Sequence, residues 1–133
     1  MYLLDTNIVS YWMRRDRSVI EKVRNHRPCD LFISTITLAE ILFGIEKSPV
    51  RKCERRIRLN SIRKQMELLQ FDESAAIKYA GIRAYMETNG IPISERDLQI
   101  ASIALANELD VITHNVKEFG RVPNLRVIDW ADK

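Results

Sequence analysis

Short apolar runs alternate with segments of helical periodicity along the whole chain. The first run has no polar alternation, which is typical of a strand buried on both faces of a parallel sheet. Asp5 ends that run and stands at the carboxyl edge of the strand, where open α/β sheets bind their ligands. Strands are predicted at residues 2–4, 31–34, 111–113 and 126–128.

Helix-forming segments fill the intervals between these runs. Ser18-x-x-Glu21 matches a capping box, and the helix that it opens must end at Pro28. Helices are predicted at residues 8–13, 18–27, 35–45, 75–89 and from residue 94, with one helical turn at most in 114–120. The alternation indicates an α/β fold, a small, mostly parallel central sheet flanked by helices. The 133 residues are expected to form one domain, 1–133.

Basic residues concentrate in the first half of the chain. The formal net charge is only +3, but residues 14–64 carry 14 Lys or Arg against 6 Asp or Glu. Such a region is a common electrostatic footprint for a polyanion, although solvated helix faces give similar runs. Residues 50–68 combine a basic face with an apolar stripe. The stripe consists of Cys53, Ile57, Ile62, Met66 and Leu69.

The composition excludes several classes of protein. The chain is 46% hydrophobic and 29% charged, as ordinary globular proteins are, and no run approaches the roughly 18 apolar residues of a membrane span. The N-terminus lacks the basic region of a secretory signal, so a cytoplasmic protein is expected. Cys29 and Cys53 have no metal-binding spacing and are expected to be reduced thiols. The sequence contains no glycine-rich phosphate loop, HExxH pattern or nucleophile elbow.

Four acids occupy positions that a solvated surface charge does not readily explain. Asp5 and Glu118 follow strand ends, while Glu40 and Asp97 lie in the first turns of helices that follow extended segments. In a parallel sheet with right-handed crossovers, all four positions face the same edge and can converge. Each acid alone has a simpler explanation: Asp5 caps a helix, Glu40 and Asp97 complete capping boxes that begin at Thr37 and Ser94, and Glu118 is an exposed loop residue.

A cluster of carboxylates requires protons or cations, because unpartnered carboxylates a few ångströms apart repel strongly. All-oxygen ligation suits Mg²⁺ or Mn²⁺, which bind one or two carboxylates each and keep waters for chemistry. The pattern therefore indicates metal-assisted hydrolysis. His26 and His114 are the only histidines, stand in no metal-binding pattern, and are expected to be surface or hydrogen-bonding residues.

Four segments together resemble the PIN-domain ribonucleases, and most of all the VapC-type toxins of bacterial and archaeal toxin–antitoxin pairs. They are LLDTN, ISTITLAEILFGIE, GIPISERDLQIASIALA and VITHNVKEFGRVPNLRVIDW, in this order and over nearly the whole chain. The resemblance implies the PIN fold and an endoribonuclease whose carboxylates hold Mg²⁺ or Mn²⁺. It also implies an inhibiting VapB-type antitoxin. A homodimer is expected separately, from apolar residues in excess of what a domain of this size buries.

The resemblance also assigns roles to acidic and polar residues. Asp5, Glu40 and Asp97 match the core metal-binding acids, with Asp5 and Asp97 taken as the metal ligands. Glu118 matches the fourth acidic position, where many relatives have Asp, so its longer side chain would act through water. Thr6 and Asn115 are expected to support the acids by hydrogen bonds.

Two surfaces are expected beside the acids. RNA phosphates would contact the basic region at Arg14, Arg15, Arg55 and Arg56. A subunit or antitoxin would cover apolar residues in excess of what the domain buries. These residues are Trp12, Met13, Leu42 and Ile45.

Three alternatives remain open from the sequence. Haloacid-dehalogenase-like phosphatases also begin with an apolar strand and Asp, but their second Asp is replaced here by Asn7. A nuclease of the same fold that acts on DNA is chemically plausible, because metal-assisted hydrolysis does not itself discriminate sugars. A binding module would use the basic face alone, and substitution of Asp97 separates it from a nuclease.

Overall fold

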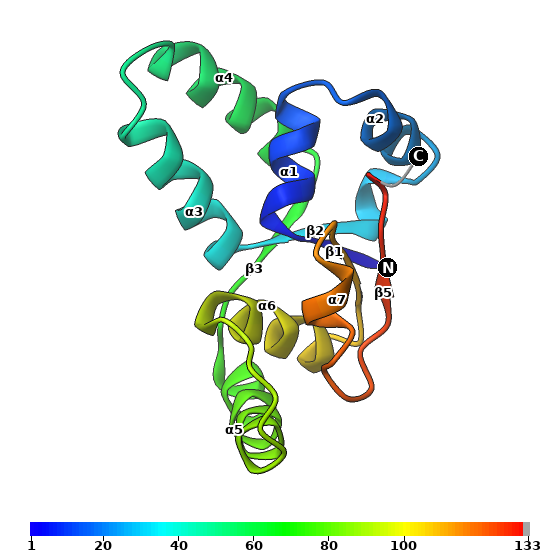
Figure 1. The fold of residues 1–133 in the computed structure, drawn as a ribbon. Coiled ribbons are helices and arrows are strands. Elements are labelled where there is room, and N and C mark those ends of the chain that lie inside the picture. Colours follow the sequence, from blue (N-terminus) through cyan, green and yellow to red (C-terminus); the bar gives the residue numbers. More distant parts are fainter. Residues whose placement is uncertain (132–133) are drawn as a thin grey trace.

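The computed structural model describes residues 1–131, and Figure 1 shows a central sheet with helices on both faces. The strands are β1 (Tyr2–Leu4), β2 (Leu31–Ser34), β3 (Glu67–Leu69), β4 (Asp110–Ile112) and β5 (Val127–Ile128). The helices are α1 (Thr6–Met13), α2 (Arg17–Arg24), α3 (Thr35–Glu46), α4 (Lys52–Arg63), α5 (Glu73–Thr88), α6 (Glu95–Ala106) and α7 (Val116–Phe119), with a 3-10 turn at Pro28–Asp30. The predicted α/β fold is confirmed.

The order of the strands places a crevice beside β1. All strand pairs are parallel, and the order across the sheet is β3-β2-β1-β4-β5. The chain builds outward from β1 to β3 and then continues on the other side of β1 with β4 and β5. The direction of winding therefore reverses between β1 and β4, which is where open α/β sheets bind ligands.

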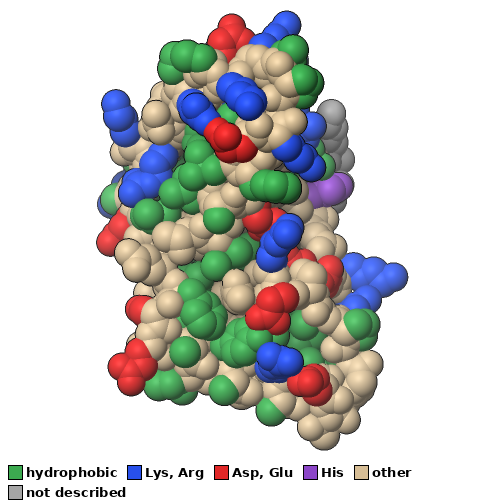
Figure 2. Space-filling view, turned by 90° about the vertical axis from the view of Figure 1, so that its left-hand side faces the viewer, with side chains coloured by type: hydrophobic (Ala, Val, Ile, Leu, Met, Phe, Trp, Pro, Cys, Tyr) green, Lys and Arg blue, Asp and Glu red, His purple; other side chains and the backbone are tan. Residues whose placement is uncertain are grey.

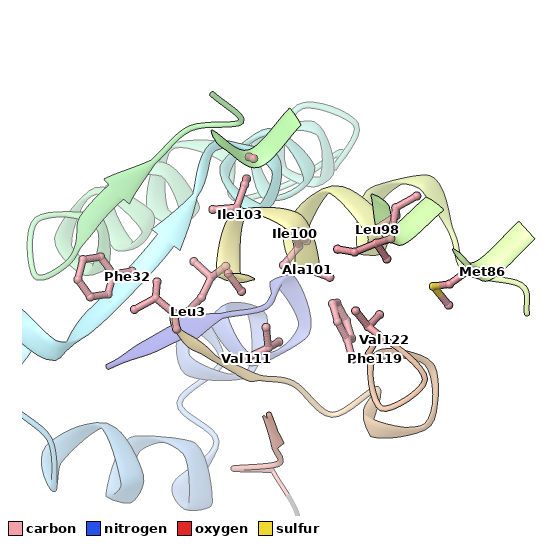
Figure 3. Close-up of a cluster of buried hydrophobic side chains, with 14 residues drawn as sticks. Leu3, Phe32, Met86, Leu98, Ile100, Ala101, Ile103, Val111, Phe119 and Val122 are labelled. Carbon is pink, nitrogen blue, oxygen red and sulfur yellow. The ribbon is translucent and has the colours of Figure 1, made fainter. Parts of the chain in front are cut away.

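Two apolar layers cover the two faces of the sheet. Leu3 and Val111 point into the layer under α5 and α6, which Figure 3 shows in close-up. Their neighbours Leu4 and Ile112 point into the opposite layer, under α1 to α4. Because successive strand residues face opposite sides, a three-residue strand without polar positions can supply both layers.

Side chains at the helix ends define where the helices begin and end. Ser94 caps α6 as predicted, since its hydroxyl accepts from the Asp97 backbone N–H at 3.3 Å. Two predicted caps are wrong by a few residues. Asp16 rather than Ser18 caps α2, and Ser34, not Thr37, caps α3. In both helices a good capping side chain lies at the true end, slightly upstream of the predicted one.

The basic stretch at residues 50–68 is not one continuous element. α4 ends at Arg63, and β3 then pairs with β2. The prediction missed β3 because the strand has only three residues and begins with an exposed Glu67. The predicted stripe is also wrong at its start: Cys53 and Ile57 are exposed, whereas Leu59 and Ile62 are the buried residues of α4.

Several surface expectations can be compared with the structure. Met13 and Ile45, expected on an exposed apolar surface, are buried at 9% and 3% exposure, whereas Leu42 is exposed. Cys29 and Cys53 are both exposed and form no disulfide with each other. Within residues 1–131, no helix has the length and apolar character needed to cross a membrane.

Candidate functional site

Asp5 lies at the reversal point of the sheet, between the ends of β1 and β4. Its backbone N–H donates to the Ile112 carbonyl at 2.8 Å, which extends the pairing of the two strands by one residue. Asp5 occupies the N-cap position of α1, yet its side chain forms no capping hydrogen bond. Instead, its Oδ2 accepts a hydrogen bond from the Thr113 hydroxyl at 2.7 Å. The simpler explanation of Asp5 as a helix cap is therefore wrong.

Thr113 connects Asp5 to the loop that follows β4. Its side chain is fully buried, and its oxygen accepts from the Asn115 backbone N–H at 2.9 Å while its proton goes to Asp5. The sequence pattern predicts Thr113 only as the last residue of a strand, with no part in the site. A signal was nevertheless present, because Thr113 stands just beyond β4 as Asp5 stands just beyond β1.

The environment of Asp5 favours a bound cation. Asp5 is only 4% exposed, and within residues 1–131 no Lys, Arg or His side chain forms an ion pair with it. Burial raises the pKa of Asp5, and the charges of Glu40 and Glu118 add to this, against the lowering effect of the hydrogen bond from Thr113. A positive ion beside this carboxylate would offset both the desolvation cost of burying the charge and the repulsion from the neighbouring carboxylates.

Glu40 is held from two sides in the second turn of α3. Its Oε1 lies 2.8 Å from the Thr6 hydroxyl, which in turn lies 3.1 Å from the Thr37 hydroxyl. Because a hydroxyl has one proton, Thr6 donates to Glu40 and accepts from Thr37. The other oxygen, Oε2, accepts from Arg96 Nη1 at 3.2 Å. The sequence gave no sign of this contact, because Arg96 and Glu40 belong to different helices.

Asp97 and Glu118 meet through Asn115. The Asn115 side-chain amide donates to Asp97 Oδ2 at 3.3 Å and to Glu118 Oε2 at 3.0 Å, while Glu118 Oε1 accepts from the Ser94 backbone N–H at 2.6 Å. Burial and the charges of Asp5 and Glu118 raise the pKa of Asp97 to about 7. Partial burial would raise the pKa of Glu118 as well, but hydrogen bonds from Ser94 and Asn115 outweigh it and lower that pKa.

Three of the predicted acids line a single open cavity of ≈ 470 Å³. They are Asp5, Glu40 and Asp97, and the predicted supporting residues Thr6 and Asn115 line the same cavity. Glu118 adjoins it through Asn115.

The chemistry of this cavity fits a divalent cation. Within residues 1–131, no three Asp, Glu, His or Cys side chains stand close enough to hold one ion together. Mg²⁺ does not need such a cage, because it binds through one or two carboxylates and keeps several waters. The donors are oxygens, and the pKa values of Asp5 and Asp97 are both raised by burial and by neighbouring negative charge.

The four predicted RNA-binding arginines do not share one surface. Arg14 lines the acidic cavity and also an adjoining cavity of ≈ 320 Å³, which Arg55 lines as well. Arg15 lines a third cavity together with residues of α2 and α4. Arg56 forms an ion pair with Glu46. Of the four, Arg14 therefore lies in the acidic cavity itself and Arg55 in the cavity next to it.

Comparison with known proteins agrees with this geometry. The PIN domain family model matches residues 2–125. The chain is 36% identical to Ribonuclease VapC1 of Haemophilus influenzae (strain R2866), over 98% of each sequence. It is 34% identical to the tRNA(fMet)-specific endonuclease VapC of Salmonella typhimurium, again over 98% of each.

Solved structures show the same fold. One is VapBC2 from Rickettsia felis bound to a DNA fragment from its promoter, with a TM-score of 0.91 and 32% identity over 97% of this chain and 98% of that one. Another is DNA-bound VapBC from Salmonella typhimurium, with a TM-score of 0.90 and 32% identity over 97% of each. The chain therefore belongs to the PIN-domain family and, within it, to the VapC ribonucleases.

Proposed function

We propose that this VapC ribonuclease is a toxin that cleaves RNA phosphodiester bonds with the help of Mg²⁺ or Mn²⁺ and is inhibited by a cognate antitoxin. The observation that carries the proposal is the convergence of Asp5, Glu40 and Asp97 on one cavity at the reversal point of the sheet. The family membership removes the phosphatase alternative.

The acids of the cavity and their hydrogen-bond partners have different roles in this mechanism. Asp5 and Asp97 would hold the cation, and Thr113 and Asn115 orient them by hydrogen bonds. Glu40 faces the same cavity and is oriented by Thr6. When bound, the cation neutralises the scissile phosphate and lowers the pKa of the attacking water. Glu118 holds Ser94 and so supports the start of α6, from which Asp97 projects.

Metal dependence is the direct test of the proposal. Excess EDTA is expected to abolish cleavage of a labelled RNA, and added Mg²⁺ or Mn²⁺ to restore it. The ion should also raise the melting temperature without RNA, because a ligand present at a hundred times its Kd stabilises the folded state by about 2.7 kcal/mol. Undiminished cleavage in excess EDTA would rule out this mechanism.

We propose RNA as the substrate in a cytoplasmic setting. The Salmonella relative is named as a tRNA(fMet)-specific endonuclease, which makes that tRNA the first RNA to assay. Arg14 and Arg55 both line the cavity that adjoins the acids, so both are available to contact phosphates of the bound strand. Such contacts give affinity without sequence information. A DNA strand of the same sequence is the matched control, since the metal chemistry alone does not distinguish the sugars.

We propose that the antitoxin occupies the cavity of ≈ 320 Å³ beside the acids. Its wall combines apolar Met13, Ile41 and Ile45 with Arg55, and Glu40 lines it too. An apolar antitoxin segment would lie on the apolar wall and could bring an Arg to the carboxylates, where a guanidinium pairs bidentately. The structures from Rickettsia felis and Salmonella typhimurium are of VapBC bound to DNA, and a structure from Mycobacterium tuberculosis is of a member of the VapBC family of toxin–antitoxin systems.

A homodimer is the expected assembly, formed through the exposed apolar side of α3. Figure 2 shows the face that carries α3, with apolar side chains exposed across it. Leu42 and Phe43 are 40% and 62% exposed there. Light scattering should give twice the chain mass, and Leu42→Glu should shift it towards one chain. Val116→Glu is the control, because Val116 is also 40% exposed but lies on α7. A wild-type monomer at high micromolar concentration would count against the dimer.

A further inference from the structure

α1 has a buried face and a face turned to the acidic cavity. Ile8, Val9 and Met13 pack in the core, whereas Tyr11 and Arg14 line the cavity beside Asp5 and Asp97. Tyr11 and Arg14 are three residues apart and so lie on the same side of the helix. The Arg14 guanidinium carbon lies 5.0 Å from the centre of the Tyr11 ring, a cation–π distance.

His114 adds a third flat group beside this pair. Its ring stands edge-on to the Tyr11 ring, with 5.9 Å between centroids and 78° between planes. Two contacts hold it: Nδ1 lies 2.9 Å from Asp129 Oδ2, and the backbone N–H donates to Asn7 Oδ1 at 3.1 Å. Because an ionised carboxylate only accepts, Nδ1 carries a proton, so Nε2 is an acceptor when the ring is neutral and a donor when it is protonated.

We propose that Tyr11, Arg14 and His114 form a nucleobase-binding subsite for the nucleotide next to the cleaved bond. The inference rests on the proposed function, in which the acids of the same cavity receive the scissile phosphate. A base is separated from its phosphate by a single sugar, so a phosphate at the acids places a base against the neighbouring wall. That wall contains the Tyr11 ring and the Arg14 guanidinium, and the exposed His114 imidazole stands against the Tyr11 ring beside it.

The chemistry of these groups suits a base better than a bare phosphate chain. Unpaired bases stack on tyrosine rings and on guanidinium planes, and this stacking tolerates different sequences. Within residues 1–131, no carboxylate forms an ion pair with Arg14, so its charge remains available to the flanking phosphate. His114 Nε2 could accept a hydrogen bond from an exocyclic amine of the base.

Binding of two matched probes tests the subsite in the cleavage-deficient Asp97→Asn protein with Mg²⁺ present. One probe is a short single-stranded RNA of mixed sequence. The other is a chain of abasic tetrahydrofuran spacers with the same number of phosphates. Adding Tyr11→Leu, which keeps apolar bulk against the core, is expected to weaken binding of the RNA about 5- to 100-fold and of the abasic chain less than about twofold. Tyr11→Phe keeps the ring and should bind both probes nearly as the parent does.

Two further variants keep the test decisive. His114→Ala alters an exposed residue and should give the same RNA-selective loss, smaller in size, even if Tyr11→Leu does not fold. Tyr85→Leu removes a tyrosine on α5 that is 47% exposed and lies outside the cavity, so both probes should bind it as they bind the parent. Equal losses on both probes, or no loss on either, would overturn the subsite. Failure of the wild-type protein to cleave RNA would instead overturn the proposed function, whichever way the binding results fall.

Discussion

Asp97→Asn is expected to reduce the cleavage rate at saturating RNA by a factor on the order of a thousand, because a cation at a phosphoryl oxygen contributes several kcal/mol to the transition state. The fold should survive, since asparagine has the same size and its oxygen can still accept from Asn115. The control is Asp110→Asn. Asp110 begins β4 at the opposite edge of the sheet, where it pairs with Arg126, and its substitution should leave the rate unchanged.

The same variant should change how the stability of the metal-free protein depends on pH. The pKa of Asp97 is raised from 3.8 to about 7 in the folded state, so folding binds a proton between these values. The stability from this group is present below about pH 4 and is lost as the pH rises to about 7. Asp97→Asn should therefore melt higher than wild type at pH 8 by several degrees, given about 4 °C per kcal/mol, and the gain should shrink towards pH 5. A near wild-type rate of RNA cleavage for Asp97→Asn would instead show that Asp97 has a structural role and no catalytic one.

Thr113→Val is expected to have the largest effect on stability among single substitutions at the site. Valine has nearly the same shape, but it removes the donor to buried Asp5 and the acceptor for the Asn115 backbone N–H. Leaving buried polar groups unpaired costs about 1–3 kcal/mol each, so the free energy of unfolding should fall by about 2–4 kcal/mol in urea titrations. Cleavage should fall by about 10- to 100-fold, as for other residues that orient metal ligands.

Thr113→Ser is the matched control for this experiment. Serine keeps the hydroxyl and loses only a methyl group, so both hydrogen bonds should persist and most of the activity with them. If the serine and valine variants lose the same amount of stability and activity, the methyl packing of Thr113 matters and its hydrogen bond to Asp5 does not.

Much of the architecture was predictable, because hydrophobic periodicity identifies the strands and helices and the strand ends indicate where the site lies. The apolar run before Asp5 indicated a central strand, and the position of each acid relative to its strand or helix indicated a common edge. Asp5, Glu40 and Asp97 do line one cavity. Topology alone is enough for this prediction, since the carboxyl ends of parallel strands meet at the same edge of a sheet.

Contacts between distant side chains were not predictable in the same way. Arg96 follows a helix cap and looks like a solvated residue, yet it reaches Glu40 on another helix. β3 is too short to show a period and was assigned to the preceding basic stretch. Thr113 lies in a β-branched run, where a threonine usually reflects strand propensity alone. In each instance the deciding partner lies far away in the sequence.

The hydrogen bond between Asp5 and Thr113 has a consequence for the protein during its own synthesis. It joins residues 108 positions apart, and β4, the neighbour that completes the pocket around β1, begins only at Asp110. A nascent chain on the ribosome cannot form that pairing until residues 110–113 have been translated and have left the exit tunnel. The pocket around Asp5 is therefore assembled only after β4 has emerged, and partial chains released before that point lack the Thr113 partner of Asp5.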